Sequence, residues 1–376
     1  MISSAQTRDP YLVKAVMHSS CLLKSFRSPG EALSLKELAS RAGLQKTMVF
    51  RLLYTLQKCG MVEKVGENLY QSCLRQWKQK LYRLGYAAQG ADDQFSKDVS
   101  LGLQRAAAAE GIELITLDNR YSPRTAQRNA ELLVKEKVDL VIEFQVDELI
   151  APVIAAIYRE AGIPLIAIDI PHPGATYYGA NNYGAGLMAG RYLGKWVKDN
   201  WNSELDEVIF LELGRAGPLP RMRLTGMLSG LHSVLQNSKN CKTIYLDGDG
   251  ELGHSFEAVR RHLRTSRSRR QVLGAINDPS ALGAIRAFQE AGRTECCAIV
   301  GHNACLEGRM ELRQPNSRLI GSVAFFPERY GEDVTRVSLD ILNRRPVPPA
   351  VFVDHKLITR ATVDHYYPND CLLQAI

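Results

Sequence analysis

Residues 111–144 have the sequence GIELITLDNRYSPRTAQRNAELLVKEKVDLVIEF, and this stretch decides the class of fold. It begins with a short apolar run, passes through a polar loop into a helical stretch, and ends with a second apolar run. Residues 241–278, CKTIYLDGDGELGHSFEAVRRHLRTSRSRRQVLGAIND, follow the same order. Strands that alternate with helices in this way form parallel sheets covered by helices on both faces, so the sequence predicts an α/β protein.

The alternation extends over the chain from residue 82 onward. Apolar runs recur at 164–170 (PLIAIDI) and 207–214 (EVIFLELG), each with helical stretches on either side. There are too many such runs for one small lobe, and the likeness of the two stretches quoted above favours two similar lobes. We therefore predict a two-lobed domain. Its expected bounds are residues 82–366, with lobe 1 at about 82–180 and 326–350 and lobe 2 at about 181–325 and 351–366.

Polar and aromatic side chains follow the predicted strands, at the points where the strands end. Ligands of parallel sheets bind beyond the carboxyl ends of the strands, so a cleft between the lobes is the expected pocket. Carboxylates, amides and arginines hydrogen-bond vicinal hydroxyls, and aromatic rings cover the apolar faces of a sugar, so the set is typical of a carbohydrate site. The set comprises Asp92, Asp93, Gln94, Phe95, Glu143, Asp169, Arg221, Arg223, Asn277, Asp278, His302, Asn303, Phe325 and Phe326.

Several of these residues have a purely structural alternative. Asp169 can cap the loop that follows its strand, and Arg221 can pair with a neighbouring carboxylate at the start of a helix. Phe95 can belong to the core rather than to the pocket wall, and a lone histidine such as His302 is more often packed than functional. The arginine-rich run RTSRSRR at 264–270 is interpreted as a solvent-exposed loop.

The net charge divides unevenly along the chain, although the total is only +7 over 376 residues. Residues 1–80 contain 13 Lys+Arg and 5 Asp+Glu, which gives +8. The other 296 residues contain 34 Lys+Arg and 35 Asp+Glu, which gives −1. The basicity belongs to the first 80 residues, and this part is expected to contact a polyanion.

The basic part has the pattern of two short helices joined by a tight turn. Ser34 stands three residues before Glu37, which is the capping box of a helix start. Gly43 supplies the left-handed residue that ends this helix. A second helix, over about residues 46–58, carries apolar residues at helical spacing. Two helices in this order predict a helix-turn-helix.

A short hairpin is expected at 62–71, directly after the second helix. A hairpin in that place is the wing of a winged helix-turn-helix, so we assign residues 1–72 to such a domain and residues 73–81 to a linker. The alternative is another small helical domain with a basic surface.

The run ALSLKELASRAGLQKTMVFRLLYTLQKCGMVEKVGENLYQ at 32–71 resembles the N-terminal winged helix of IclR-type regulators. It shares the L-x-E-L-A-x-R-A-G-L turn and the K-[ST]-x-V-x-R-L-L-x-T-L recognition helix, and it departs at Gln45, where that family usually has proline. Such a recognition helix lies in the major groove and the wing rests on phosphate, so the resemblance implies double-stranded DNA as a partner. Each charged side chain in the set can alternatively be a solvated surface residue. The implied DNA-binding residues are Gln45, Lys46, Thr47, Met48, Arg51 and Lys64.

The larger part resembles the periplasmic-binding-protein type I fold, in the form found in LacI/GalR-type regulators and close to ribose-binding proteins. The motifs that carry the likeness include AGIPLIAID (161–169), GANNYGAGLMAGRYL (179–193) and NDPSALGAIRAFQEAG (277–292), and the likeness extends over about residues 82–360. It implies a small effector, a sugar or polyol, bound between the lobes. The implied ligand contacts are Asp93, Phe95, Glu143, Asp169, Arg221, Asn277, His302, Asn303 and Phe325.

Three positions depart from the pattern of the sugar binders. Ile170 stands where these proteins typically have an arginine directly after the strand-end aspartate, and Asn303 stands where they have an aspartate. Phe325 stands where many have a polar anchor. Fewer charged groups favour a less polar or substituted ligand over a simple pentose or hexose.

The rival interpretation is a Rossmann-like or nucleoside-hydrolase-like enzyme with an accessory basic domain. Gly184, Gly186 and Gly190 imitate a dinucleotide fingerprint, but their spacing is G-x-G-x-x-x-G. Phosphate-binding and nucleophile motifs are absent from the sequence, and its eight cysteines form no C-x-x-C pair. We therefore expect no catalytic residue, no cofactor and no metal.

The apolar runs are all much shorter than the roughly 18 residues of a membrane span. The first residues also lack the pattern of a signal peptide. We therefore expect a cytoplasmic transcriptional regulator with a winged helix-turn-helix and a two-lobed sensor. We expect a homodimer that binds a DNA operator under the control of a small ligand and has no membrane partner. Release and recruitment of DNA by the ligand are both open at this point.

Overall fold

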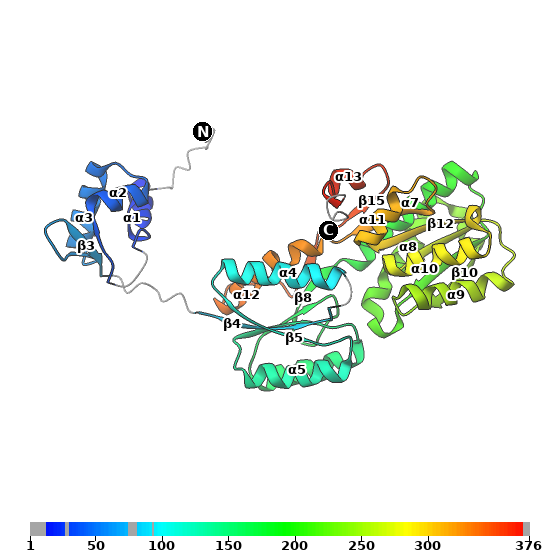
Figure 1. Ribbon diagram of the computed structural model, residues 1–376, viewed down its shortest axis with the longest axis horizontal. Helices are drawn as coiled ribbons and strands as arrows, with labels where there is room; N and C mark the ends of the chain where they lie inside the picture. Colours follow the sequence, from blue (N-terminus) through cyan, green and yellow to red (C-terminus); the bar gives the residue numbers. More distant parts are fainter. Residues whose placement is uncertain (1–12, 27–29, 74–80, 92–93, 371–376) are drawn as a thin grey trace. The chain divides into compact units, whose positions relative to one another are not determined.

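The computed structural model describes residues 13–26, 30–73, 81–91 and 94–370. The chain divides into two compact units, Met1–Leu81 and Tyr82–Ile376, and each is described by itself (Figure 1). Residues 74–80, which make up most of the expected linker, and Asp93 lie outside the described residues.

Unit 1 is a helical domain with a small antiparallel sheet, whose strand order is β1-β3-β2. Ser34 Oγ accepts a hydrogen bond from the Glu37 amide (3.3 Å), and the Glu37 carboxylate accepts one from the Ser34 amide (2.9 Å). This is the expected capping box, and Gly43, at a φ of 65°, ends the helix in the left-handed region. The helices and strands of unit 1 are α1 (Lys14–Leu23), β1 (Ala32–Ser34), α2 (Leu35–Ala42), α3 (Lys46–Lys58), β2 (Val62–Lys64) and β3 (Leu69–Ser72).

Unit 2 contains two six-stranded sheets, one in each lobe. The lobe 1 sheet has the order β14-β8-β7-β6-β4-β5 and is parallel throughout. Its strands are β4 (Arg83–Ala88), β5 (Glu113–Asp118), β6 (Leu140–Phe144), β7 (Leu165–Ile168), β8 (Thr176–Ala180) and β14 (Ala350–Val353).

The lobe 2 sheet has the order β10-β9-β11-β12-β13-β15 and is parallel except at β15, which runs antiparallel to β13. Its strands are β9 (Glu207–Glu212), β10 (Lys242–Asp247), β11 (Gln271–Ala275), β12 (Cys297–Asn303), β13 (Leu319–Ala324) and β15 (Lys356–Ile358). The predicted α/β architecture with two similar lobes is therefore confirmed.

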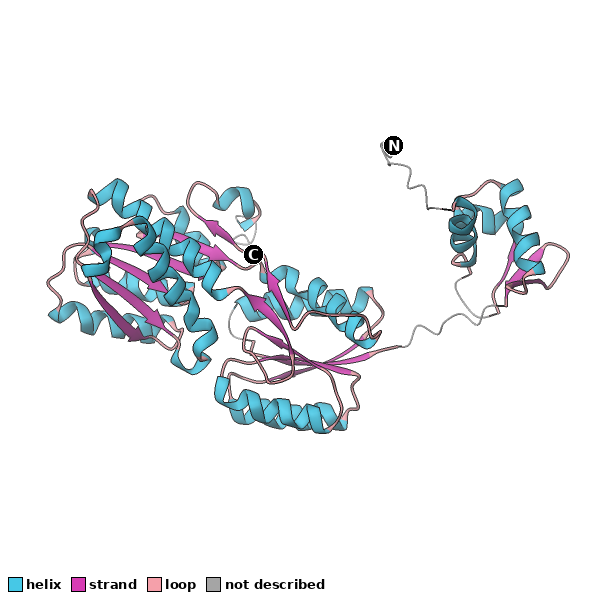
Figure 2. Cartoon of the chain, turned by 180° about the vertical axis from the view of Figure 1, so that it is seen from behind, coloured by secondary structure: helices cyan, strands magenta, loops and turns pink. Residues whose placement is uncertain are grey.

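Helices cover both faces of each sheet, so each lobe has three layers (Figures 1 and 2). In lobe 1, α4 and α12 share one core with the sheet, and α5 and α6 share another. In lobe 2, α7 and α8 cover one face, and α9, α10 and α11 cover the other. The α-helices are α4 (Gln94–Ala109), α5 (Pro123–Lys135), α6 (Ala151–Glu160), α7 (Asn182–Trp201), α8 (Pro218–Val234), α9 (Leu252–Thr265), α10 (Asp278–Glu290), α11 (Leu306–Arg313), α12 (Tyr330–Leu342) and α13 (Val363–Tyr366). The short 3-10 helices are η1 (Glu148–Ile150), η2 (Gly214–Ala216), η3 (Gln236–Asn240), η4 (Thr294–Cys296) and η5 (Pro327–Arg329).

The point at which the chain last crosses from lobe 1 to lobe 2 differs from our prediction. We assigned residues 351–366 to lobe 2, but β14 pairs with β8 and completes the lobe 1 sheet. The chain crosses to lobe 2 only between Val353 and Lys356, where β15 joins β13. No helix separates β14 from β15, so the alternation of strands and helices on which the prediction rested gives no signal at this crossing.

Two of the three glycines that imitate a dinucleotide fingerprint, Gly186 and Gly190, serve helix packing. A Cβ added to Gly186 would lie 1.9 Å from the carbonyl oxygen of Arg223, and one on Gly190 would lie 1.9 Å from that of Met227. Gly226 and Gly230 on α8 approach the backbone of α7 in the same way. These four glycines let α7 and α8 touch backbone to backbone, which accounts for Gly186 and Gly190 without a nucleotide.

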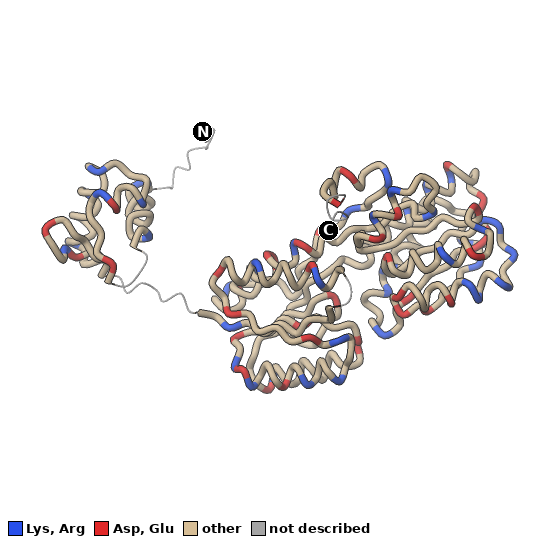
Figure 3. The backbone as a smooth tube through the Cα atoms, in the orientation of Figure 1, with Lys and Arg blue, Asp and Glu red and all other residues tan. Residues whose placement is uncertain are grey.

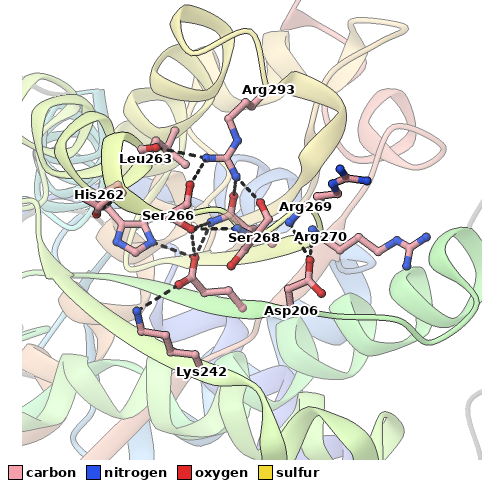
Figure 4. A network of polar contacts seen from close by, with 12 residues as sticks. Asp206, Lys242, His262, Leu263, Ser266, Ser268, Arg269, Arg270 and Arg293 are labelled. Carbon is pink, nitrogen blue, oxygen red and sulfur yellow. Dashed lines mark hydrogen bonds and ion pairs between the residues drawn. The ribbon is translucent and has the colours of Figure 1, made fainter.

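The arginine-rich loop at 264–270 lies at the amino ends of the lobe 2 strands, opposite the edge where ligands of such sheets bind. The buried Glu207 carboxylate accepts hydrogen bonds from His262 Nε2 (2.9 Å) and Ser266 Oγ (3.0 Å). The Arg269 and Arg270 amides donate to Asp206 (2.7 and 2.9 Å) (Figure 4). The backbone of this loop is therefore anchored while its arginines are at the surface.

Charges of both signs are interspersed along unit 2 (Figure 3). Among the described residues, no helix has the length and the apolar character needed to cross a bilayer.

Candidate ligand cleft and candidate DNA-binding helix

Unit 2 has a cavity of about 570 Å³ whose lining residues come from both lobes. The lobe 1 residues follow β4, β5, β6 and β7, and the lobe 2 residues follow β9, β10, β11 and β12. The cavity therefore lies at the carboxyl ends of parallel strands, as the sequence predicted. Four of the expected ligand contacts line it, namely Phe95, Asp169, Asn277 and Asn303.

Asp169 is the lobe 1 carboxylate of this cavity and directly follows β7. Its backbone adopts a φ of 60°, an uncommon conformation that Asp tolerates better than most residues. Its Oδ1 atom is buried and has no hydrogen-bond partner in the described part of the chain. Burial raises the pKa of this carboxyl to about 6, and the charge of Arg223 opposes the rise. An orphaned acceptor of this kind is suited to a ligand hydroxyl or amine.

Arg223 is the corresponding lobe 2 cation and lies on α8. Its Nε donates to Asn182 Oδ1 (2.6 Å) and its Nη1 to the Ile276 carbonyl (3.0 Å). The guanidinium carbon lies 4.7 Å from the centre of the Phe325 ring. Burial lowers the pKa of Arg223, whereas the charge of Asp169 raises it. Two hydrogen bonds and a ring therefore hold the guanidinium in place at the cavity wall.

Arg221, the arginine that we predicted, does not line the cavity. Its side chain is exposed and forms an ion pair with Glu212 at 2.8 Å. Residues two apart on a helix point in nearly opposite directions, so only one of Arg221 and Arg223 can face inward. Buried Met227 lies four residues after Arg223 and marks the inward side of α8. That helical spacing is a signal from which the sequence could have identified Arg223.

Phe95 contributes an aromatic wall to the cavity. Its ring centre lies 6.3 Å from that of Phe144 and 5.6 Å from that of Tyr330, the latter edge to face. Phe95 therefore belongs both to the wall and to the core that supports it.

Asn277 is a polar residue of the lobe 2 side of the cavity. It caps α10 by accepting from the Ser280 amide (3.0 Å), and its Nδ2 donates to the Gly250 carbonyl (2.8 Å).

Glu143 does not line the cavity, and our prediction for it is wrong. Its carboxylate is fully buried and accepts hydrogen bonds from Asn119 Nδ2 (2.8 Å) and the Tyr158 hydroxyl (3.3 Å). Burial raises its pKa to about 8. Side chains alternate between the faces of a strand, and Glu143 points into the layer of α6 rather than to the strand ends.

His302 and Phe325 are also absent from the cavity lining, contrary to our prediction. His302 is buried and its Nδ1 donates to the Ala275 carbonyl (2.9 Å), while its ring stacks on that of Phe325. Burial lowers the pKa of His302 to about 3, so the imidazole is neutral at physiological pH. The two rings form a support behind Arg223.

Glu143→Gln is expected to leave ligand binding within about twofold of the wild type. At pH 7 a carboxyl of pKa about 8 is protonated, and glutamine has nearly its shape and is likewise neutral. Isothermal titration calorimetry with a ligand found by the screen described below measures this. A large loss of affinity in a folded variant would show that Glu143 contributes to ligand binding after all.

A group of three side chains, two of which line the cavity, has the composition of a metal site. Asp249, Glu251 and His254 each offer one ligand atom, and these atoms lie within 4.8 Å of one another. Asp249 forms an ion pair with Arg215 (3.0 Å), and His254 lies 3.4 Å from Glu251. Ion pairing accounts for the group, and we assign no metal to it.

The second candidate site is the outer face of α3. Val49, Leu53 and Leu56 are buried in the core of unit 1. The predicted contacts Gln45, Lys46, Thr47, Met48 and Arg51 are exposed, as is Lys64 on β2. Their exposure is what contact with a groove requires, and it leaves their role a prediction.

Two aromatic residues on α3 were missed. Phe50 and Tyr54 are 55% and 59% exposed, which is unusual for large apolar side chains. They lie one helical turn apart, outside the buried stripe of Val49, Leu53 and Leu56. The helical periodicity of the sequence could have shown that both fall on the exposed side.

A two-lobed binding fold with a cleft at its strand ends, joined to a helix-turn-helix, defines the class of this protein. The family model described as "Periplasmic binding protein domain" matches residues 84–346, and the chain belongs to this family. The "IclR helix-turn-helix domain" matches residues 16–66. Both resemblances inferred from the sequence are confirmed, and both matched domains are binding modules.

Curated relatives are ribose import binding proteins RbsB. The Salmonella typhimurium protein is 25% identical over 263 residues, 69% of this chain and 84% of the relative. The Haemophilus influenzae protein is 26% identical over 284 residues, 73% of this chain and 91% of the relative.

Solved structures with the same fold include proteins with a bound sugar. A solute binding protein from Actinobacillus succinogenes with bound D-allose has a TM-score of 0.66 at 17% identity, covering 76% of this chain and 100% of that one. A Mycobacterium smegmatis protein in complex with β-D-fucofuranose has a TM-score of 0.68 at 21% identity, covering 78% of this chain and 96% of that one. At these identities the likeness shows the fold.

Proposed function

We propose that this protein is a transcriptional regulator whose affinity for a DNA operator is controlled by a sugar or polyol bound between its two lobes. The observation that carries the proposal is the cavity itself. Asp169 of lobe 1 and Arg223 of lobe 2 both line it, and the positive charge of Arg223 acts on the Asp169 carboxylate. A ligand that bonds both side chains stabilises the lobes in one arrangement. Through the matched helix-turn-helix domain, that arrangement would control the affinity for DNA.

The regulator is proposed to act as a homodimer in the cytosol. One recognition helix of 13 residues contacts only a few base pairs, and two helices on half-sites about one helical turn apart double the contact. Ligand binding would then change the spacing of the two helices. Size-exclusion chromatography with light scattering, with and without DNA, measures the assembly directly.

The sensor is tested by a melting-temperature screen of the full chain against pentoses, hexoses, inositols and polyols. A ligand that binds only the native state raises the melting temperature. At 100 times its dissociation constant, such a ligand adds about 2.7 kcal/mol to the free energy of unfolding. If none of these compounds changes the melting temperature, the proposal of a sugar or polyol sensor is wrong.

Arg51→Ala is expected to weaken binding to the operator by about 10- to 100-fold, which is the discrimination that one good arginine–base contact provides. The operator is first selected from random DNA with the full chain. Fluorescence anisotropy at fixed salt then compares the selected site with unrelated DNA. Lys36→Ala, which removes one exposed positive charge from α2, is the matched control. If both variants lose affinity equally on both DNAs, Arg51 contributes only charge and does not recognise bases.

A further inference from the structure

The cavity offers few hydrogen-bonding atoms to a ligand. Three lining residues have a buried side-chain atom without a hydrogen-bond partner in the described residues, namely Asp169 Oδ1, Gln145 Nε2 and Arg215 Nε. Arg215 Nε forms an ion pair with Asp249, which leaves Asp169 Oδ1 and Gln145 Nε2 for a ligand. Asp169 follows β7 and Gln145 follows β6, and these strands are neighbours in the lobe 1 sheet. The unsatisfied acceptor and donor are therefore on the same side of the cavity.

Most other polar groups of the lining are already engaged within the protein. Asn277 uses its oxygen for the Ser280 amide and its nitrogen for the Gly250 carbonyl. Arg215 and Asp249 are paired with each other at the cavity mouth. A ligand with hydroxyls on every side would find partners for only some of them, and the rest would lose their hydrogen bonds to water.

One region of the lining is apolar and joins the lobes. Val146 and Ile170 from lobe 1 and Ala216 from lobe 2 belong to one buried apolar cluster, against which Tyr121 of lobe 1 and Leu213 of lobe 2 pack. All five line the cavity. We call these five residues the apolar clasp.

Four of the five side chains of the apolar clasp, all except Tyr121, are aliphatic and differ from those expected around a sugar ring. Aromatic rings cover the faces of a sugar, and Phe95 and Phe144 provide such a wall elsewhere in the same cavity. Val146, Ile170 and Leu213 are instead aliphatic. Val146 and Ile170 are buried in their cluster, and the half-buried Leu213 leaves aliphatic surface, which gains most from an alkyl or aryl group. Ile170 directly follows Asp169, so aliphatic surface begins next to the unsatisfied carboxylate.

We infer that the effector is amphipathic, with a hydroxylated part that bonds Asp169 and Arg223 and an alkyl or aryl substituent that packs against the apolar clasp. A glycoside or an alkylated polyol has this chemistry. A cavity of about 570 Å³ lies within the range of roughly 300–1,000 Å³ that encloses ligands of this size. The inference rests on the proposed function, because it concerns the ligand of the same cleft.

The substituent would also promote closure. Leu213 of lobe 2 already packs against the cluster that contains Ile170 of lobe 1, so a substituent that contacts both lobes there adds apolar contact to an arrangement in which the lobes touch. A substituted ligand is therefore expected to bind more tightly than its parent sugar and to change operator binding at lower concentration.

The test is a ladder of ligands on the full chain. Free D-ribose, D-glucose and D-galactose are compared with their methyl, butyl and phenyl glycosides by calorimetry. In one of the three series, the butyl glycoside is expected to bind at least tenfold more tightly than the methyl glycoside, at up to about fourfold for each buried methylene.

Two variants separate the apolar clasp from general hydrophobicity. Leu213→Asn changes shape little but introduces an amide. It is expected to remove the gain from the butyl group, which is measured within the variant as the ratio of its affinities for the butyl and methyl glycosides. Leu149→Asn, at a residue that is 86% exposed and outside the lining, is the matched control and keeps the gain. Circular dichroism confirms that both variants are folded.

The outcomes distinguish this inference from the proposed function. If a parent sugar binds and its butyl or phenyl glycoside binds equally or more weakly, the amphipathic effector is wrong while the sensor stands. An equal gain in wild type and Leu213→Asn also overturns the inference, because the substituent then lies elsewhere. If neither these sugars nor their glycosides bind, and the inositols and polyols of the melting-temperature screen have no effect either, the proposed sugar or polyol sensor itself fails.

Discussion

Asp169→Asn is expected to weaken effector binding by about 100-fold and to make the protein more stable. The aspartate offers the effector a buried, unpartnered carboxylate oxygen next to Arg223. Hydrogen bonds to a charged acceptor contribute about 1.5–3 kcal/mol each, so the loss of one or two of them lowers affinity by about 100-fold. Calorimetry with the ligand identified in the melting-temperature screen measures the loss.

The gain in stability follows from the direction of the pKa shift. Burial raises the pKa of Asp169 from 3.8 to about 6, so the folded chain binds this proton more tightly than the unfolded chain does. Stability is therefore lost as pH rises from about 4 to about 6, and the loss, about 3 kcal/mol at most, persists above that range. Asparagine does not titrate, so the variant's advantage should grow over this interval and then stay constant.

Denaturant unfolding at several pH values checks the second half of this prediction. Glu143→Gln is the matched control, because Glu143 is a buried carboxyl on the neighbouring strand β6 that does not line the cavity. The Glu143→Gln variant should bind the ligand nearly as tightly as the wild type does, whereas Asp169→Asn should bind it about 100-fold more weakly. A variant at position 169 that binds normally, or that is less stable than the wild type at pH 7.5, would contradict the role given to Asp169.

Gly190→Ala is expected to destabilise lobe 2 by several kcal/mol, even though alanine is the better helix former. The added Cβ would lie 1.9 Å from the carbonyl oxygen of Met227, which is backbone and cannot turn aside. The helices α7 and α8 must separate, and the core that they share with the sheet loosens. Thermal and denaturant unfolding of the full chain measure the effect.

Gly253→Ala is the matched control for this experiment. Gly253 also lies in a lobe 2 helix, α9, but nothing lies within 4 Å of a Cβ built there. Removing this glycine should leave stability unchanged or raise it by up to about 1 kcal/mol. Equal effects at the two positions would show that close packing of α7 on α8 is not what Gly190 provides.

Local patterns in the sequence predicted the elements well, because they depend on neighbours along the chain. Ser34 and Glu37 cap α2 as expected, and Gly43 ends it. The alternation of apolar runs and helices correctly indicated two parallel sheets. The crossing after β14 was missed because it has no helix to mark it.

The sequence predicted the position of the cleft correctly, but it predicted only some of the residues that line it. Strand order brings the carboxyl ends together, so Asp169 and Asn277 could be located from their positions after strands. Which side chain then faces the cavity depends on the strand face or the helix turn on which it falls. For that reason Glu143 points into a helix layer and Arg221 points to solvent, while Arg223 lines the cleft.

The sequence by itself determined the two-part design, because charge and periodicity are properties of a chain: a basic head of helix-turn-helix pattern and a neutral body of alternating strands and helices. Only the tertiary structure decided the chemistry of the cleft. Val146, Ile170 and Leu213 are far apart in sequence and meet because two sheets bring their strand ends to one cavity. Burial, which no local pattern records, leaves Asp169 with an unsatisfied oxygen and an altered pKa.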